Sequence, residues 1–342
     1  MYLWKETGEA GLDCLTATSK LYIIKYNSCI QNTFCTGKAV YHSGFFGAVL
    51  NERAYISMNE YRMKAYAKIN LGLDVVGRLE NGYHEVRMVM QTVGIYDELS
   101  LERIPEGIVV TTDCGELPDG EDNLIYKAAK LMKEHYKIGE GIRIHLKKQI
   151  PIAAGMAGGS TDAAATMKGI NRLFDLGCTL RELMDLGVEI GADVPYCVMG
   201  GTALAEGIGE KLTALPAAPD CFLLVAKPDI NVSTKYVYEH LDSEGIDKHP
   251  DIDGMVAAIE EGSLQGVLDR MANVLENVTV KAYPIIDTIK RRMRELGAVG
   301  SLMSGSGPTV FGIFLEESKA QAAYRQIVDE ALAKQVFVTE FR

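Results

Sequence analysis

A run of small residues near the middle of the chain has the composition of a loop that holds an anion. Residues 151–165 read Pro-Ile-Ala-Ala-Gly-Met-Ala-Gly-Gly-Ser-Thr-Asp-Ala-Ala-Ala. Glycine and alanine let a ligand approach backbone N–H groups, and the apolar helical spacing that follows predicts a helix whose positive end faces the same place. The run therefore predicts a phosphate site. A tight turn between a strand and a helix is the alternative that these residues leave open.

The glycines of this run, at positions 155, 158 and 159, fit neither of two widespread nucleotide-binding motifs. No Gly-Lys-Ser/Thr follows them, as a Walker A loop requires, and their spacing is not that of a dinucleotide fingerprint. A second glycine loop, Ser-Gly-Ser-Gly-Pro at 304–308, is expected to be either a β-turn or a nest of N–H groups that binds an anion.

One carboxylate and one lysine have the residue types for phosphoryl transfer beside such a loop. Asp193 lies in Gly-Ala-Asp-Val-Pro at 191–195, where a surface turn is the ordinary interpretation. The transfer needs a carboxylate that accepts the proton of the attacking hydroxyl, and Asp193 is the candidate. Lys68 is the candidate partner, because its ammonium would stabilise the developing negative charge. A lysine on a solvated strand face is the competing interpretation.

An aromatic residue and a histidine have the chemistry to hold a nucleobase. Tyr83 and His84 follow an Asn-Gly turn at 81–82. The ring of the tyrosine would stack on a base, and the imidazole would hydrogen bond to the base edge. A pair that merely flanks a turn is the alternative.

Hydrophobic periodicity predicts the elements that position these residues. Residues 63–75 alternate between apolar and polar, which predicts a half-buried strand with Lys68 and Asn70 on one face. A helix is expected from about 122 to 136, with Asp122 as its N-cap.

The remaining elements follow no regular alternation of strand and helix. Antiparallel strand pairs are mixed with helices, so an α+β fold is favoured over a doubly wound parallel sheet. The expected strands lie at 86–101, 108–112, 142–147, 200–205, 221–226, 299–303, 310–314 and 336–341, and the expected helices at 163–173, 179–190, 234–241, 252–260, 263–271, 283–296 and 318–334.

Length and charge bound the domains and the partners. A chain of 342 residues is too long for one ordinary core. The predicted division is a poorly patterned N-terminal extension at 1–57, a first domain at 58–219 and a second domain at 220–342, with a linker at 215–219. The formal net charge of −11 makes nucleic acid or an anionic membrane an unexpected partner. The seven cysteines show no metal or disulfide spacing, which predicts a cytoplasmic protein.

Four segments in one order form a far more specific pattern than any of them alone. They are Ala-Lys-Ile-Asn-Leu at 67–71, the small-residue run at 151–165, Gly-Ala-Asp-Val-Pro at 191–195, and Gly-Ser-Gly-Pro-Thr at 305–309. This set resembles the GHMP kinase superfamily. The first segment, together with Asn-Gly-Tyr-His at 81–84, is similar to the branch that phosphorylates a cytidine diphosphate sugar-alcohol. The resemblance covers residues 63–342.

The resemblance implies a fold, a reaction and a set of site residues. The fold has a first domain like ribosomal protein S5 domain 2 and a ferredoxin-like second domain, with the site between them. The reaction is ATP-dependent phosphorylation of the 2-hydroxyl of 4-diphosphocytidyl-2-C-methyl-D-erythritol in non-mevalonate isoprenoid synthesis, with Mg²⁺ on the ATP oxygens, in a monomer or homodimer. The implied catalytic residues are Lys68 and Asp193; the ATP contacts are Asn123, Pro151, Ile152, Ala153, Ala154, Gly155, Met156, Ala157, Gly158, Gly159, Ser160 and Thr161; the substrate contacts are Asn70, Tyr83, His84, Thr234, Tyr238, Gly305 and Ser306; and Ser160 is a candidate metal-side hydroxyl.

The chain departs from the family pattern at a few positions, and these leave alternatives open. The family usually has glycine where Ala153 and Ala157 stand, and alanine is expected to keep the loop geometry with a negative φ. Asp162 stands where many members have asparagine. Tyr236 is the rival of Tyr238 for the second aromatic residue of the base site. A kinase of the homoserine or mevalonate type, and a nucleotide-binding regulator without catalysis, are the alternative functions.

Overall fold

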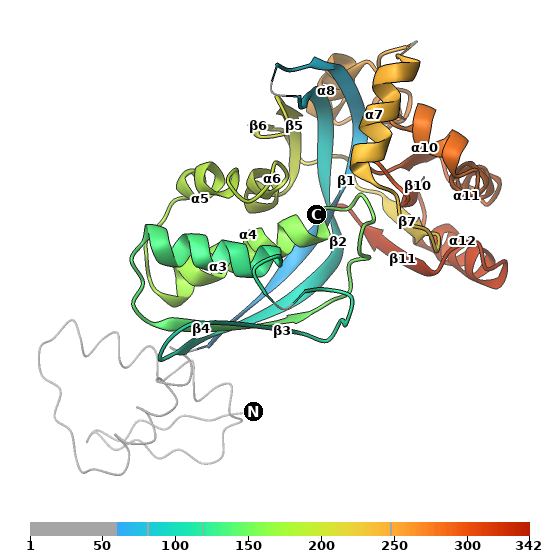
Figure 1. The fold of residues 1–342 in the computed structure, drawn as a ribbon. Coiled ribbons are helices and arrows are strands. Elements are labelled where there is room, and N and C mark those ends of the chain that lie inside the picture. The colour runs from blue at the N-terminus through green and yellow to red at the C-terminus, as the bar shows by residue number, and fades with distance from the viewer. Residues whose placement is uncertain (1–59, 81, 119, 247) are drawn as a thin grey trace, which may run out of the picture. The chain divides into compact units, whose positions relative to one another are not determined.

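The structure is a computed structural model that describes residues 60–342, except 81, 119 and 247. The predicted extension at 1–57 lies outside these residues. In the described part, strands and helices follow one another in mixed order and form two separate sheets, so the α+β prediction is confirmed (Figure 1). No helix of this part is long and apolar enough to cross a membrane.

The first sheet is built around one long hairpin. Its seven strands are β1 (Glu60–Arg78), β2 (His84–Ile104), β3 (Ile108–Thr112), β4 (Gly141–Lys147), β5 (Thr202–Glu206), β6 (Lys211–Ala214) and β8 (Ala272–Asn273). β1 and β2 pair antiparallel along their length, and the sheet continues as β3-β4-β2-β1-β8 with β5 and β6 attached to β2. Because β8 comes from the C-terminal half, this sheet crosses the predicted domain boundary at 219. That boundary stays a prediction.

Four helices pack beside the strands of this sheet that come from the first half of the chain, with α3 and α4 against the strands and α5 and α6 against α4 (Figure 1). They are α3 (Leu124–His135), α4 (Gly158–Leu173), α5 (Leu180–Gly187) and α6 (Val194–Met199). Apolar residues that recur at three- and four-residue spacing turn one face of each helix towards the sheet, so that α4 contacts β1 and β2 and α3 contacts β3. Leu101 and Ile144 of the sheet share one buried cluster with Ala128 and Ile170 of these helices.

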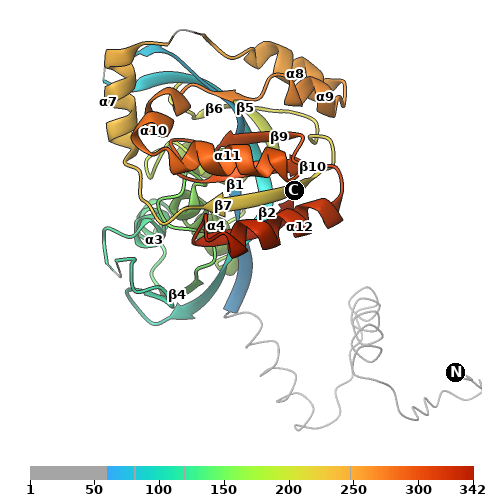
Figure 2. The same cartoon turned by 90° about the vertical axis from the view of Figure 1, so that its right-hand side faces the viewer.

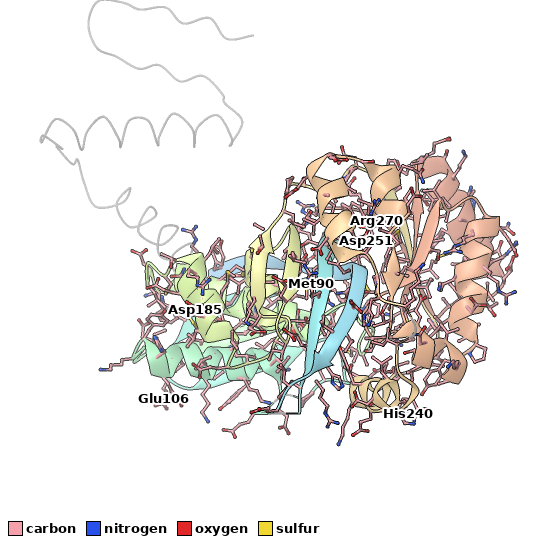
Figure 3. All side chains as sticks on the ribbon, turned by 90° about the horizontal axis from the view of Figure 1, so that it is seen from above. Met90, Glu106, Asp185, His240, Asp251 and Arg270 are labelled. Atoms are coloured by element: carbon pink, nitrogen blue, oxygen red, sulfur yellow. The ribbon has the colours of Figure 1, made fainter. Side chains whose placement is uncertain are left out.

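The second sheet is antiparallel, in the order β11-β7-β10-β9. These strands are β7 (Phe222–Lys227), β9 (Gly300–Met303), β10 (Val310–Phe314) and β11 (Gln335–Glu340), and the helices of this half are α7 (Thr234–Glu244), α8 (Ile252–Glu260), α9 (Leu264–Leu268), α10 (Glu276–Ala282), α11 (Ile285–Glu295) and α12 (Glu317–Asp329). Figure 2 shows α11 and α12 lying across one face of this sheet. Beside α8, Arg270 Nε donates to Asp251 at 2.9 Å (Figure 3).

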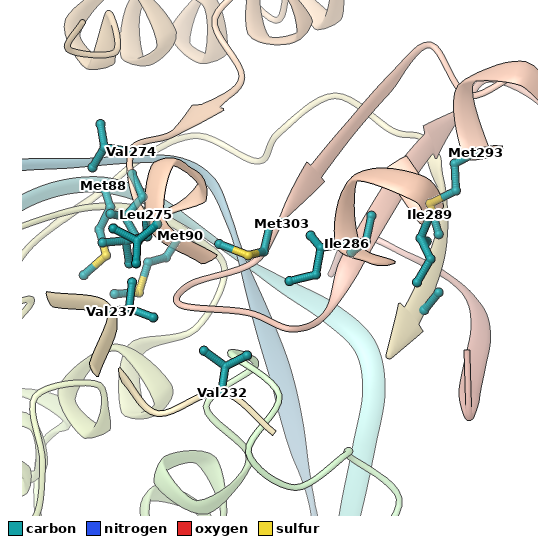
Figure 4. Close-up of a cluster of buried hydrophobic side chains, with 14 of the residues drawn as sticks. Met88, Met90, Val232, Val237, Val274, Leu275, Ile286, Ile289, Met293 and Met303 are labelled. Carbon is teal, nitrogen blue, oxygen red and sulfur yellow. The ribbon is translucent and has the colours of Figure 1, made fainter. Parts of the chain in front are cut away.

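Both faces of the second sheet are buried, and β7 shows why. Leu224 and Ala226 join the cluster that contains Ile286 and Met293 of α11 (Figure 4). Leu223 and Val225 point the other way, into a cluster formed with β1 and β2. A strand that is buried on both faces has a continuous apolar sequence, and residues 221–226 have one.

The strand that carries Lys68 is more deeply buried than its alternating sequence predicts. Residues 67–75 are all buried, including Lys68, Asn70 and Asp74. The prediction of a half-buried strand is therefore wrong for the centre of β1. Ala67, Ile69 and Leu71 face a cluster formed with the second sheet and α8. Lys68 and Asn70 lie on the other face and hydrogen bond to each other, so the polar residues of the alternation face interior partners instead of water.

Of two predicted positions before helices, one differs from its prediction and one agrees with it. Asn123 caps α3 in place of Asp122: its side-chain oxygen accepts a hydrogen bond from the Ile125 N–H at 2.8 Å. Asp193 lies in a turn, as predicted, because the Val194 N–H donates to the Gly191 carbonyl at 3.0 Å, and the same residue is the N-cap residue of the short helix α6. The proline two residues later suits the first turn of a helix, where its missing N–H has no intrahelical partner.

Two helices end earlier than predicted, and the predicted linker is packed. The helix expected at 263–271 is shortened because the chain already pairs with β1 at Ala272. The helix expected at 318–334 ends before Ala331, which has a φ of 51°. Within the expected linker, Ala218 is buried and its N–H donates to Thr202 at 3.1 Å.

The two glycine loops of the sequence meet in space. Ser304 Oγ donates to the Gly155 carbonyl at 2.9 Å. Gly155 has a φ of 71°, and a Cβ at this position would lie 2.2 Å from the Ser304 carbonyl oxygen. Only glycine permits an approach this close between the two backbones.

Replacing Gly155 by alanine will therefore destabilise the protein more than backbone strain alone can explain. The matched control is Gly107→Ala, because Gly107 has a similar φ of 81° and nothing within 4 Å of its Cβ position. We expect the control to lose about 1–2 kcal/mol from left-handed strain, and Gly155→Ala to lose a further 1–3 kcal/mol from the clash. Thermal or urea unfolding measures both, and equal losses would contradict the close approach.

Candidate active site

A cavity of about 1020 Å³ is lined by both glycine loops, the start of α4, the start of α6 and one side of α7. It brings together nearly all of the predicted site residues, although they are spread over more than 200 positions. Met156 and Thr161 are the exceptions: both are buried and do not line the cavity. Met156 instead accepts a backbone hydrogen bond from the Lys68 N–H, and Thr161 donates to the Tyr66 carbonyl.

The predicted catalytic pair lies at the centre of this cavity. Lys68 Nζ is 3.9 Å from Asp193 Oδ2 and donates to Asn70 Oδ1 at 2.8 Å. Lys68 is only 5% exposed, so its interpretation as a solvated lysine is wrong. A buried ammonium needs partners of this kind, because desolvation without them costs several kcal/mol.

Helix α6 holds Asp193 in place through contacts deep in the first half of the chain. Tyr196 Oη donates to the Gly201 carbonyl at 2.7 Å and lies 3.1 Å from Thr92 Oγ1 on β2. Lys168 of α4 donates to the Cys197 carbonyl at 3.1 Å, and burial lowers the pKa of this lysine. The carboxylate at the start of α6 is thus fixed from two sides.

Cys197 lies beside the catalytic pair without the properties of a nucleophile. Burial first, and then the nearby Asp193 charge, raises the pKa of its thiol to about 12. The thiolate is the reactive form of cysteine, so a thiol with this pKa is inert near neutral pH. This leaves Asp193 as the group beside Lys68 that can accept a proton.

The small-residue run forms a loop that ends at the N-terminus of α4. Ala157 is the N-cap residue, with a φ of 55° and no side-chain cap, so side chains leave the first N–H groups of this helix free. Helix N-termini of this kind bind anions through those N–H groups and the helix dipole. Ala153 also has a positive φ, at 50°. The expectation that both alanines have negative φ is wrong, and both occupy the left-handed geometry that glycine favours.

A buried ion cluster, which sequence reasoning missed, supports this loop from behind. Lys148 lies between the carboxylates of Asp97 and Asp162, and it is 3.1 Å from Asp162 Oδ2. Asp97 also accepts hydrogen bonds from the N–H groups of Gln149 and Ile150, which lead into the loop. Two lysines before Pro151 were a signal in the sequence, but nothing there placed the carboxylates.

Asp162 is the least satisfied member of that cluster. It is 2% exposed, and its Oδ1 has no hydrogen-bonding partner among the described residues. Burial, only partly offset by Lys148, raises the pKa of this carboxyl well above its ordinary value. An asparagine at this position would avoid the cost of burying a charge, because an amide carries none.

Asn123, the predicted adenosine contact, has both side-chain ends occupied by the protein. Its oxygen caps α3, and its Nδ2 donates to the Pro118 carbonyl at 2.7 Å. The residue still lines the cavity, together with its neighbour Leu124. Its arrangement fixes the wall near the phosphate loop.

The other end of the cavity holds the predicted base site. The rings of His84 and Tyr238 lie 4.7 Å apart between centroids, while Tyr83 is 60% exposed and lines the rim. Tyr236, the rival aromatic residue, does not line the cavity and instead stacks against His240 at 3.9 Å. Of the two tyrosines, the geometry therefore favours Tyr238. Figure 3 shows His240 on the outer side of α7.

The second glycine loop completes the wall between these two ends. Asn273 of β8 donates to the carbonyls of Met303 and Gly305 at 2.9 and 2.8 Å. Ser306 Oγ lies 2.9 Å from Thr234 Oγ1, so these two predicted substrate contacts are neighbours. Sequence reasoning missed Asn273, because a two-residue strand leaves no periodic pattern.

Comparison with known proteins agrees with this architecture. The family described as GHMP kinases N terminal domain matches residues 123–201, and GHMP kinases C terminal matches 255–334. A 4-diphosphocytidyl-2-C-methyl-D-erythritol kinase of Lachnospira eligens is 59% identical over 83% of this chain and 99% of its own length. The kinase of that name from Lachnoclostridium phytofermentans is 50% identical over 83% and 98%. A crystal structure of 4-(cytidine 5'-diphospho)-2C-methyl-D-erythritol kinase matches with a TM-score of 0.71 and 32% identity, over 82% of this chain and 99% of that chain.

The two matched domains and the cavity between the glycine loops define a GHMP kinase, as predicted. Sequence identities of 50% and 59% over almost the full length of the relatives also identify the branch of the GHMP kinases to which the chain belongs. The chain belongs to the family of 4-diphosphocytidyl-2-C-methyl-D-erythritol kinases, which are phosphotransferases.

Replacing either strained alanine of the loop by glycine will stabilise the protein. A left-handed backbone costs alanine about 1–2 kcal/mol, and glycine avoids this strain. Glycine gives back about 0.5–1 kcal/mol of the strain relieved, because its unfolded chain has more conformational entropy to lose. We expect Ala153→Gly and Ala157→Gly each to gain roughly 0.5–1 kcal/mol in urea unfolding. Ala154→Gly is the control, because Ala154 is not among the residues with positive φ. It should lose stability, and an equal gain there would refute the strain.

Replacing Asp162 by asparagine will make stability less dependent on pH. Because the folded-state pKa is raised, the folded protein keeps this proton where the unfolded chain has released it. This proton therefore adds to the free energy of unfolding at low pH. The contribution is lost as pH rises through the folded-state pKa, and the free energy of unfolding falls by up to about 1.4 kcal/mol per pH unit. The melting temperature of Asp162→Asn should therefore exceed that of the wild type by more at pH 8 than at pH 5. Asp185→Asn, at an exposed site on α5, should show no such trend.

Proposed function

We propose that this protein transfers the γ-phosphoryl group of ATP to the 2-hydroxyl of 4-diphosphocytidyl-2-C-methyl-D-erythritol. The observation that carries the proposal is the position of the Lys68–Asp193 pair, between an uncapped helix N-terminus on one side and the His84–Tyr238 rings on the other. The names of the relatives support the choice of substrate. The phosphate loop receives the triphosphate. The cytosine binds at Tyr83, His84 and Tyr238, where the tyrosine rings stack on the base and the imidazole hydrogen bonds to its edge.

Proton transfer and charge stabilisation divide between the two central residues. Asp193 accepts the proton of the attacking hydroxyl, while the new O–P bond forms and the bond between the β- and γ-phosphates breaks to release ADP. Lys68 stabilises the negative charge on the attacking oxygen, and Asn70 holds the ammonium in place from the other side. The N–H groups at the start of α4 stabilise the charge on the transferred group.

A magnesium ion in this site would need only a few ligands from the protein. Among the described residues, no group of three His, Cys, Asp or Glu side chains could hold a metal ion by itself. Mg²⁺ in kinases needs only one or two protein oxygens, since phosphates and water supply the others. Ser160, which lies in the first turn of α4 and lines the cavity, is the residue that would contribute a hydroxyl. The ion would neutralise charge on the phosphate oxygens.

The cysteines fit a reducing compartment, and we propose the cytoplasm. The four cysteines in the described part are free thiols. Disulfides form in oxidising compartments and are rare in the cytosol.

Asp193→Asn is the variant that tests the proposed function. We expect kcat to fall about 10²- to 10⁴-fold, because the amide cannot accept the proton, while the affinity for an ATP analogue stays within about twofold. A coupled ADP-release assay and isothermal titration calorimetry measure the two quantities. Asp185→Asn on α5 is the control and should leave both unchanged.

The outcome separates the alternative functions. Unchanged turnover in Asp193→Asn would refute the assigned proton acceptor. A regulator without catalysis would show nucleotide binding but no turnover even in the wild type, and a kinase of another branch would prefer homoserine or mevalonate to the cytidine substrate.

A further inference from the structure

A carboxylate on α7 is bonded to the histidine of the base site. Asp242 Oδ1 lies 2.6 Å from His84 Nε2, and its Oδ2 lies 3.3 Å from a guanidinium nitrogen of Arg78. The three residues come from α7, the start of β2 and the end of β1. Helix α7 stands beside this end of the β1–β2 hairpin in both ribbon views (Figures 1 and 2).

These residues form the wall of the cavity. Arg78, His84, Tyr238 and Asp242 all line it, and the His84 side chain is only 12% exposed. Tyr238 is one helical turn before Asp242, so α7 supplies both the ring beside the imidazole and the carboxylate behind it. The orientation of the imidazole is therefore determined by α7.

The contact with Asp242 decides which nitrogen of the neutral imidazole carries the proton. A carboxylate only accepts hydrogen bonds, so Nε2 must be the nitrogen that donates. In the neutral ring, Nδ1 then keeps its lone pair and acts as an acceptor. Within the described part of the chain, His84 makes no second side-chain hydrogen bond, which leaves Nδ1 for a ligand.

An acceptor in this position distinguishes the pyrimidines by the group at C4. Cytosine presents an amino group there, which can donate to Nδ1. Uracil presents a carbonyl oxygen, whose lone pairs would face the lone pair of Nδ1. A site that leaves a buried polar group unpaired rejects the wrong ligand strongly.

We propose that Asp242 is a positioning residue that keeps the proton of His84 on Nε2, and that it thereby makes the base site selective for a pyrimidine with an amino group at C4. Arg78 supports this role, because it holds the second oxygen of the carboxylate. The inference rests on the proposed function for the identity of the base, and it adds the residue that enforces the choice.

Binding of CDP and UDP tests this independently of turnover. With the ATP site saturated by a non-hydrolysable ATP analogue, titration calorimetry gives both dissociation constants for the wild type and for Asp242→Asn. We expect the wild type to prefer CDP by about tenfold or more, and the variant to reduce this preference to within about threefold, because the amide can donate to Nε2 and shift the proton to Nδ1. Asp253→Asn is the matched control, since Asp253 also pairs with an arginine but lies outside the cavity lining. It should keep the wild-type ratio.

Nitrogen-15 NMR of the wild type tests the same point without any variant. The proposal requires the neutral His84 to show a protonated Nε2 and an unprotonated Nδ1. An Nδ1–H tautomer, or equal binding of CDP and UDP by the wild type, would overturn the proposal, as would an unchanged preference in a folded Asp242→Asn. If the wild type prefers CDP but does not phosphorylate the cytidine sugar-alcohol, the proposed function fails and this inference stands.

Discussion

The contact between the two glycine loops is the constraint on which the rest of the site depends. Gly155 and Ser304 are separated by about 150 positions, yet their backbones approach so closely that no side chain fits between them. The same loop accepts the backbone N–H of Lys68 through Met156. One point therefore sets the distance between the phosphate loop, the catalytic strand and the second sheet, and a change there would move all three.

Burial of charge explains why so many interior hydrogen bonds surround the cavity. Lys68, Lys148 and Lys168 are each enclosed by the first half of the chain, and each has acceptors within hydrogen-bonding distance or close to it. Unpaired, any of them would carry a desolvation cost comparable to the whole stability of a domain. Lys68 and Lys148 line the cavity, so two of these interior cations lie where the phosphates of a ligand would need them.

Much of the fold could be predicted from the sequence, and the predictions that failed did so for physical reasons. Long periodic segments such as α4 and the second sheet follow their patterns, because one face of each packs against a continuous core. β6, β8 and α10, with four, two and seven residues, are too short to show a period. Alternation on β1 was misread, because partners from distant segments bury its polar face, and a single sequence does not contain that information.

In the site, the residues that form motifs could be predicted from the sequence, and the residues that support them could not. Lys68, Asp193 and the loop stand out because their residue types match a reaction, while Asp97 and Asp242 have neither a motif nor unusual neighbours. Their importance arises only from the lysine and the histidine that the fold places against them. Residues that touch a ligand can be recognised by chemistry alone. Residues that fix a proton or a charge on those residues need the tertiary structure, since the partner is what defines their role.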